Sequence, residues 1–236
     1  MIALLALMLA APAADVLREE QTPLLHFRYG WPAAAGQSPR LRAELRRQLA
    51  AARRWALGHA VEGRRMARRN GFDYIQQDYD QVWETAGSSA QLLSLTSSTF
   101  ALTGGAHGNM SDSALLWDRA DDRAVEARNL LGAGLGGMAP RFCAELDRQR
   151  AERRDAPVAA DPDDPFNRCP PLAEQVLAPA DTDGNGRFET LRVMLPPYVA
   201  GPYVEGEYVV DVAFDPGDLA AVPDRYRPAF EAIGDR

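Results

Sequence analysis

A long amphipathic helix near the start of the chain is the feature that most constrains its fold. Ser38 and Pro39 form a helix N-cap followed by a proline at the first helical position. Apolar side chains then recur at intervals of three or four residues, at Leu41, Leu45, Leu49, Ala52 and Ala56. The helix is expected to run to about residue 69, because Asn70 and Gly71 follow as a stop signal.

Most of the remaining sequence alternates in the manner of β-strands. Strands are expected at residues 24–32, 91–102, 113–118, 174–178, 188–195 and 208–214, and an aromatic, alternating stretch begins at residue 72. A second helix is expected at 137–154 and a short one near 216–219. The helices do not separate the strands in a regular βαβ rhythm, which favours an α+β class. We therefore predict mainly antiparallel sheets packed against a long N-terminal helix and a second, mid-chain helix.

The overall composition is that of a globular protein and argues against one class of partner. The 236 residues are 46% hydrophobic and 25% charged, with no internal repeat and no linker long enough to require a second domain. The net charge of −7 does not fit a general nucleic-acid binder, which needs a basic surface to neutralise phosphates. All 26 basic residues are arginine, and many of them lie on the predicted long helix. We interpret that helix face as solvated and paired with acids elsewhere, with binding of an anionic partner as the alternative.

The first 13 residues are typical of a signal peptide. An apolar run that begins at Met1 is followed by Ala11-Pro12-Ala13, which fits the pattern of a cleavage site. The run is too short to cross a bilayer, which takes about 20 apolar residues. No Lys or Arg precedes it, and the competing interpretation is a buried N-terminal helix. We expect export to the periplasm or outside the cell, with residues 14–236 as a single domain.

Cys143 and Cys169 are the two cysteines of the chain. In an oxidising compartment such a pair is expected to form a disulfide. The bond would close a loop of about 26 residues and, in the chain-entropy account, stabilise the fold by roughly 3 kcal/mol. Two free buried thiols or a redox pair are the alternatives, although the spacing does not resemble Cys-x-x-Cys.

A glycine-rich segment at residues 103–109 is the first candidate for function. Gly104 and Gly105 permit positive φ and a tight connection between strands. The segment lacks the Gly-Lys-Ser/Thr ending and the G-x-G-x-x-G spacing of phosphate-binding loops. His107 could act as a general base with an acid such as Asp112, which would make the chain a small hydrolase. The chain has three histidines, too few for a multi-His metal site to be expected, and we favour a structural or binding role for His107.

A second segment reproduces the first half of a calcium-binding loop. The residues at positions 1, 3, 5, 6 and 9 of that motif are Asp181, Asp183, Asn185, Gly186 and Glu189. Position 12, where a bidentate Glu belongs, is Arg192. Asn185-Gly186 between two strand-like runs is also a hairpin signal. We favour the hairpin and keep a Ca²⁺-stabilised structural protein as the alternative.

A third segment, residues 195–208, places two tyrosines among prolines and glycines just before a strand. Such a turn is ordered, and its amphipathic rings serve either core packing or recognition. The predicted contact surface combines this turn with the glycine-rich segment and comprises Gly104, Gly105, His107, Tyr198, Tyr203 and Glu205.

Three segments together resemble a known family. They are residues 103–108 (Thr-Gly-Gly-Ala-His-Gly), 129–131 (Asn-Leu-Leu) and 197–206 (Pro-Tyr-Val-Ala-Gly-Pro-Tyr-Val-Glu-Gly). They are similar to the paired extracytoplasmic domains of unknown function in the anti-sigma regulator RsiV and in the accessory region of the deacetylase PdaC. The strand at 24–32 resembles the opening strand of that family, and the similarity covers roughly residues 22–232.

The resemblance implies an α+β domain of the cell envelope, and RsiV-like members recognise lysozyme. This chain shows no anti-sigma segment, transmembrane helix or deacetylase metal motif, so signalling and deacetylation are not carried over. Nor does spacing indicate a Ser-His-Asp, Cys-His or paired-carboxylate arrangement. We therefore predict a non-catalytic exported binding protein without a required cofactor, whose partner is a lysozyme-like protein or a peptidoglycan fragment. A periplasmic hydrolase using His107 and a calcium-stabilised structural protein are the alternatives.

Overall fold

The computed structural model describes residues 15–158 and 164–233. The predicted signal peptide, residues 1–13, lies outside the described residues. The helices are α1 (Pro39–Asn70), α2 (Ala127–Leu131) and α3 (Gly134–Arg154). The strands are β1 (Val16–Gln21), β2 (Leu25–Trp31), β3 (Gln77–Val82), β4 (Glu84–Ser88), β5 (Leu92–Leu102), β6 (Asn109–Asp118), β7 (Arg123–Val125), β8 (Val176–Ala180), β9 (Thr190–Leu195) and β10 (Tyr208–Ala213). Within these ranges, no helix has the length and apolar character needed to cross a membrane.

The larger of two sheets has seven strands in the order β1-β2-β3-β5-β6-β7, and β4 pairs with β5 beyond the end of β3. β2 and β3 run parallel because α1 connects them as a crossover helix. All other strand pairs of the seven-stranded sheet are antiparallel. The predicted hairpin across the glycine-rich segment is confirmed as the pair β5–β6.

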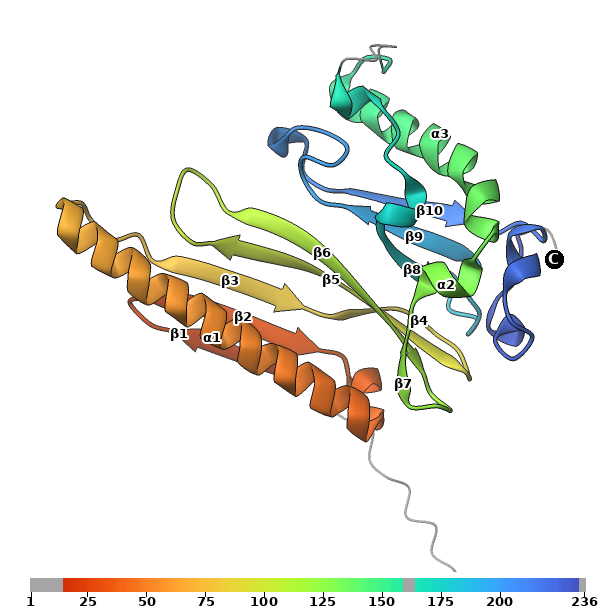
Figure 1. The fold of residues 1–236 in the computed structure, drawn as a ribbon, viewed down its shortest axis with the longest axis horizontal. Coiled ribbons are helices and arrows are strands. Elements are labelled where there is room, and N and C mark those ends of the chain that lie inside the picture. Colours follow the sequence, from red (N-terminus) through yellow and green to blue (C-terminus); the bar gives the residue numbers. More distant parts are fainter. Residues whose placement is uncertain (1–14, 159–163, 234–236) are drawn as a thin grey trace, which may run out of the picture.

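The predicted long helix is confirmed as α1, which covers one face of the seven-stranded sheet (Figure 1). The Ser38 hydroxyl accepts a hydrogen bond from the Leu41 N–H at 3.0 Å, and the helix ends at Gly71 with φ of +73°. Its buried stripe packs on the aromatic side chains of β2, and this core includes Leu41, Leu45, Ala56, Ala60, Phe27 and Tyr29. The exposed remainder carries most of the helix's arginines, as expected of a solvated face.

The second sheet is antiparallel, has the order β10-β9-β8, and lies under α3. Met138, Phe142 and Leu146 of α3 are fully buried and share one core with Val193 and Val210 of the sheet. The predicted mid-chain helix is thus confirmed, starting at Gly134 rather than at residue 137. The predicted short helix near 216–219 is a 3-10 turn at Asp218–Ala221.

The two sheets meet where side chains are small. β8 contacts β4, β5 and β6, and the cluster at this contact is made of Ala86, Ala114, Ala178 and Ala180. Figure 1 shows the resulting layers in the order α1, seven-stranded sheet, three-stranded sheet and α3. The α+β class with mainly antiparallel sheets packed against these two helices is confirmed.

One edge strand was not anticipated from the sequence. β1 lies at the margin of the seven-stranded sheet, paired only with β2 within the described ranges. Its side chains are mostly exposed, including Arg18 and Glu19, so it lacks the apolar alternation by which strands are recognised.

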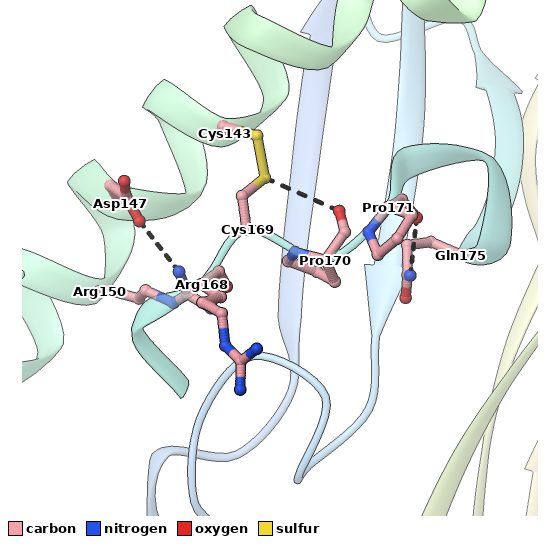
Figure 2. The surroundings of a disulfide bond; sticks show 8 residues. All are labelled: Cys143, Asp147, Arg150, Arg168, Cys169, Pro170, Pro171 and Gln175. Carbon is pink, nitrogen blue, oxygen red and sulfur yellow. Dashed lines mark hydrogen bonds and ion pairs between the residues drawn. A yellow bond between two sulfur atoms is a disulfide. The ribbon is translucent and has the colours of Figure 1, made fainter. Parts of the chain in front are cut away.

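The predicted disulfide is present between Cys143 of α3 and Cys169 (Figure 2). The two Cα atoms are 5.5 Å apart. The bond fastens the segment that leads into β8 to the side of α3. Bonds of this kind persist in oxidising compartments, which agrees with the expected location without establishing it.

Replacing both cysteines with serine is expected to lower the free energy of unfolding by about 2–4 kcal/mol, because the unfolded chain is no longer constrained by the closed loop. Urea unfolding followed by circular dichroism measures this change. A reductant should destabilise the wild type by a similar amount and leave the double variant unaffected. A wild type that is indifferent to reductant would contradict the prediction.

Candidate functional site

The two loops predicted to form a contact surface meet in the structure. The β5–β6 loop brings His107 onto Tyr203 of the β9–β10 loop, with ring centroids 4.0 Å apart and an interplanar angle of 26°. The ring of Tyr198 lies 5.9 Å from that of Tyr203, and its hydroxyl is 3.5 Å from His107 Nε2. We call His107, Tyr198 and Tyr203 the aromatic platform. In Figure 1 both loops lie at the end of the sheets opposite the C-terminus.

The aromatic platform is open to solvent. Tyr198 is 56% exposed and His107 is exposed as well, whereas Tyr203 is half-buried. Val204, which follows Tyr203 in the chain, is 89% exposed. Tyr198 also has a φ of +75°, which is rare for a bulky residue and costs on the order of 1–3 kcal/mol. Its N–H donates to the carbonyl of Gly201 at 2.9 Å, which helps to hold this conformation. The backbone at Tyr198 is therefore strained, although its large ring remains exposed to water.

A fully buried arginine holds the loop that carries both tyrosines. Arg150 of α3 is 0% exposed. Its guanidinium donates to the carbonyl of Ala200 in the β9–β10 loop, to the carbonyl of Arg168 and to the carboxylate of Asp147, each at 2.9 Å. Figure 2 shows Arg150 and Asp147 below the disulfide. A buried charge is tolerated only when its donors are satisfied, so the position of the loop is fixed by this side chain.

Glu205, predicted as a contact residue, is engaged within the protein. Arg154 donates to its two carboxylate oxygens at 2.9 and 3.1 Å, and the Tyr208 hydroxyl donates to it as well. Burial alone would raise the pKa of the Glu205 carboxyl, but the hydrogen bonds from Arg154 and Tyr208 hold it below its ordinary value. A Cβ at Gly201 would stand 2.2 Å from Glu205 Oε2, so this close approach requires glycine. Through these contacts, Glu205 helps to hold the loop that carries the two tyrosines.

The glycine-rich loop has the predicted turn geometry, with φ of +106° at Gly104 and +95° at Gly105. Both glycines are exposed. His107 Nδ1 lies 2.8 Å from the carbonyl of Gly108. Among the described residues, none of the contacts of His107 is a carboxylate. The acid proposed for a hydrolase, Asp112, is hydrogen-bonded elsewhere, so the structure does not join this pair.

A polar cleft of about 360 Å³ separates the two sheets next to the platform. Its lining includes Arg28, Asp80, Ser98, Arg192, Met194 and Glu207. On one wall Arg28 pairs with Asp80 across β2 and β3 at 2.9 Å, and on the other Arg192 pairs with Asp211 across β9 and β10 at 2.8 Å. Glu207 belongs both to this lining and to the end of the tyrosine-bearing loop. The cleft and the platform therefore share one segment.

A pair of carboxyl groups bridges the sheets at this junction. The Ser98 hydroxyl lies 2.8 Å from both Asp112 Oδ1 and Glu207 Oε2. Ser98 and Asp112 face each other across β5 and β6, whereas Glu207 precedes β10. Burial raises the pKa of Asp112 to about 6, and the adjacent carboxyl of Glu207 adds to the rise. Asp112 therefore tends to keep its proton under mildly acidic conditions.

The predicted hairpin at Asn185-Gly186 is confirmed as the antiparallel pair β8–β9, although the long loop 181–189 connects the strands instead of a two-residue turn. Asp181, Asp183 and Glu189 converge in this loop, each with one carboxylate oxygen within 4.8 Å of the others. Asn185 lies beside them and donates through its amide to Asp183 and to Glu231. These are the four residues predicted as metal ligands, and three of them form one cluster.

Sequence reasoning missed the residues that support the site. Arg150 follows Met138, Phe142 and Leu146 at intervals of four residues, so an arginine in line with a buried apolar stripe was an available signal. No such signal marked Ser98 and Glu207, which are 109 residues apart in the chain.

Comparison with known proteins supports the fold. The sequence matches no protein family model and no curated protein. A solved DUF3298 family protein from Pseudomonas aeruginosa PAO1 superposes with a TM-score of 0.51 at 14% identity, over 91% of this chain and 99% of that one. A DUF3298 family member from Bacteroides fragilis NCTC 9343 gives a TM-score of 0.51 at 12% identity, over 84% of this chain and 88% of that one. This fold therefore occurs in a family of uncharacterised domains, while the finer resemblance to RsiV and PdaC stays a prediction.

Arg150→Met is expected to lower the free energy of unfolding by about 2–4 kcal/mol, because it leaves the buried carbonyl of Ala200 and the carbonyl of Arg168 without this donor. Chemical unfolding measures the effect. Arg148→Met is the matched control: its side chain is 55% exposed on the same helix, and the change should stay within about 0.5 kcal/mol. Equal stability of the two variants would disprove the role assigned to Arg150.

The contribution of Asp112 to the free energy of unfolding is expected to decrease as the pH rises from about 4 through about 6. The pKa of Asp112 is higher in the folded protein than in the unfolded chain, so the folded state binds the extra proton over this range and loses that advantage above it. Asp112→Asn should remove a decrease on the order of 1–2 kcal/mol from the pH profile of unfolding. A profile with the same slope in wild type and variant would be inconsistent with this assignment.

Proposed function

We propose that this chain is a non-catalytic binding protein of the cell envelope whose aromatic platform binds a glycan, such as a peptidoglycan fragment. One observation carries the proposal. Three rings from two loops about 90 residues apart converge on one exposed surface, with centroid distances of 4.0 and 5.9 Å. Amphipathic rings of this kind combine an apolar face, on which a sugar ring can stack, with polar edges that form hydrogen bonds.

The contacts that hold the platform in place indicate a binding surface that is already formed in the free protein. Arg150 and Arg154 fix the loop that carries Tyr198 and Tyr203, and the strained backbone of Tyr198 presents its ring before any ligand arrives. A group held in its binding conformation loses less conformational freedom on association. Such rigidity around exposed rings has no evident use in core packing.

The adjoining cleft offers the polar contacts that a wall glycan would need. Peptidoglycan carries hydroxyl, amide and carboxylate groups along its sugars and peptides. Arg28 and Arg192 line the cleft as donors, and Asp80 and Glu207 line it as acceptors. Planar guanidinium groups suit carboxylates, so an anionic fragment could exchange with the internal ion pairs of these arginines.

A lysozyme-like protein is the second candidate partner. The exposed ring of Tyr198 and the near-complete exposure of Val204, which follows Tyr203 in the chain, favour it, because aromatic side chains are enriched in the anchors of protein interfaces. A hydrolase using His107 has less support, since the ring contacts a backbone carbonyl and two tyrosines and no described carboxylate.

Tyr203→Ala is expected to weaken binding of soluble peptidoglycan fragments about tenfold, because it removes the central ring of the platform. Tyr203→Phe should bind within about twofold of the wild type, since stacking does not need the hydroxyl. Isothermal titration measures both, with lysozyme as the second ligand in parallel. A response to lysozyme alone would assign the surface to a protein partner.

Trp55→Ala provides the matched control. Trp55 is also an exposed ring, 46% accessible, but lies on α1 at the opposite face of the seven-stranded sheet. Its removal should leave the affinity unchanged. If Trp55→Ala abolishes binding and Tyr203→Ala does not, the platform is not the binding surface. If neither ligand binds the wild type, the proposed function is wrong.

A further inference from the structure

The β8–β9 loop contains a group of carboxylates that the proposed glycan surface does not use. Asp181 accepts hydrogen bonds from the N–H groups of Gly184, Asn185 and Gly186 at 2.8–3.1 Å, so its carboxylate sits inside the loop. One oxygen each of Asp181, Asp183 and Glu189 lies within 4.8 Å of the others. Three like charges this close repel one another unless a cation lies between them.

A separate observation on Glu189 points to a ligand. Glu189 is only 2% exposed. Its Oε1 accepts hydrogen bonds from the N–H of Thr182, at 2.7 Å, and from the Thr182 hydroxyl. Its Oε2 is also buried, and no described residue donates a hydrogen bond to it. A buried carboxylate oxygen without a partner is costly, so the site is incomplete as the protein alone builds it.

We propose that the loop 181–189 binds a calcium ion through Asp181, Asp183 and Glu189, with Glu189 as the buried ligand. The donors are oxygens, which suits a hard cation and not zinc or copper. Calcium takes six to eight oxygens in flexible geometry, so backbone carbonyls, the Asn185 amide oxygen and water would complete its shell. Magnesium demands near-ideal octahedral geometry, which an irregular loop supplies poorly.

Arg192 does not oppose this site. The calcium-loop motif would place a ligand at this position, and a cation close to the ion would weaken calcium binding by repulsion. In the structure Arg192 lies on β9 and donates to both oxygens of Asp211 on β10, at 2.8 and 2.9 Å. Its charge is therefore neutralised on the sheet, and Glu189 at position 9 takes over as the downstream carboxylate.

The ion would connect three parts of the fold. The Asp181 N–H donates to the carbonyl of Ala86 on β4 at 3.0 Å, so the loop rests on the seven-stranded sheet. A Cβ at Gly87 would come within 2.7 Å of the Asp181 nitrogen, which shows how closely the two approach. On the other side, the Asn185 amide donates to Glu231 of the C-terminal segment at 2.8 Å. Bound calcium should therefore raise the stability of the whole domain.

Isothermal titration of metal-free protein with CaCl₂ is the direct test. We expect one site with a dissociation constant of about 0.1–1 mM, as in extracellular calcium modules, and weaker binding of MgCl₂. Calcium at about ten times that constant should raise the melting temperature by about 3–6 °C. Absence of both heat and a thermal shift at about 10 mM CaCl₂ would overturn the proposal.

Glu189→Gln separates a ligand from a merely structural residue. The amide keeps the oxygen that accepts from Thr182 but removes the charge, so calcium affinity should fall at least about tenfold. Without calcium the variant should melt no lower than the wild type, because an unpaired buried charge is gone. Unchanged calcium affinity in this variant would refute the role of Glu189.

Two further variants keep the test decisive. Asp183→Asn alters an exposed ligand, so it should fold and still lose calcium affinity even where Glu189→Gln fails to fold. Glu62→Gln is the matched control, since Glu62 is an exposed carboxylate on α1 paired with Arg65 and Arg69, and it should bind calcium as the wild type does. Equal loss in Glu62→Gln would show a non-specific charge effect and refute the site. These outcomes do not depend on glycan binding, so the two proposals fail separately.

Discussion

The buried guanidinium of Arg150 is the interaction on which the organisation of the C-terminal half depends. It is the largest fully buried side chain of the described residues, and its charge forces nearby groups to supply acceptors. Those acceptors come from α3 itself, from Arg168 and from Ala200 in the β9–β10 loop. The disulfide at Cys169 fastens the same segment to the same helix one residue away. The disulfide and the hydrogen bond from Arg150 thus hold adjacent residues, Cys169 and Arg168, against α3. The same guanidinium positions the loop that carries the aromatic platform.

The shape of the candidate site follows from how the two sheets meet. Alanine side chains let β8 approach β4 and β6 closely. The cleft lies instead between other strands of the two sheets, where β2, β3 and β9 contribute Arg28, Asp80 and Arg192, and charged side chains with paired partners cannot be packed so tightly. The sheets therefore diverge into the polar cleft, and Glu207 and the platform lie where they have separated. The contrast between small apolar side chains on some strands and charged side chains on others thus accounts for both the contact and the opening.

The sequence was sufficient for the elements whose signals are local. Ser38, Gly71 and the apolar spacing between them defined α1, and the glycine-rich and tyrosine-rich segments were recognised as turns. The structure brings these two segments together at the contact of His107 with Tyr203, and their role as a binding surface stays a prediction. The roles of Arg150 and Glu205 could not be derived in this way. A salt bridge or a buried donor is defined by partners tens of residues away, and sequence periodicity reports only which face a residue occupies. The exposed strand β1 escaped notice for the converse reason, because a strand without a buried face leaves no pattern.

The charged margin formed by β1 has a consequence for the behaviour of the protein in a crowded compartment. The outer edge of a sheet offers unpaired peptide groups to which a strand of another molecule can add. Here Arg18 and Glu19 are exposed, and Glu20 is held by Arg53 of α1 at 2.7 Å. An incoming strand would have to remove water from these charges, while on β1 it would gain apolar contact from Val16 and Leu17 alone. The margin of the large sheet thereby discourages edge-to-edge self-association.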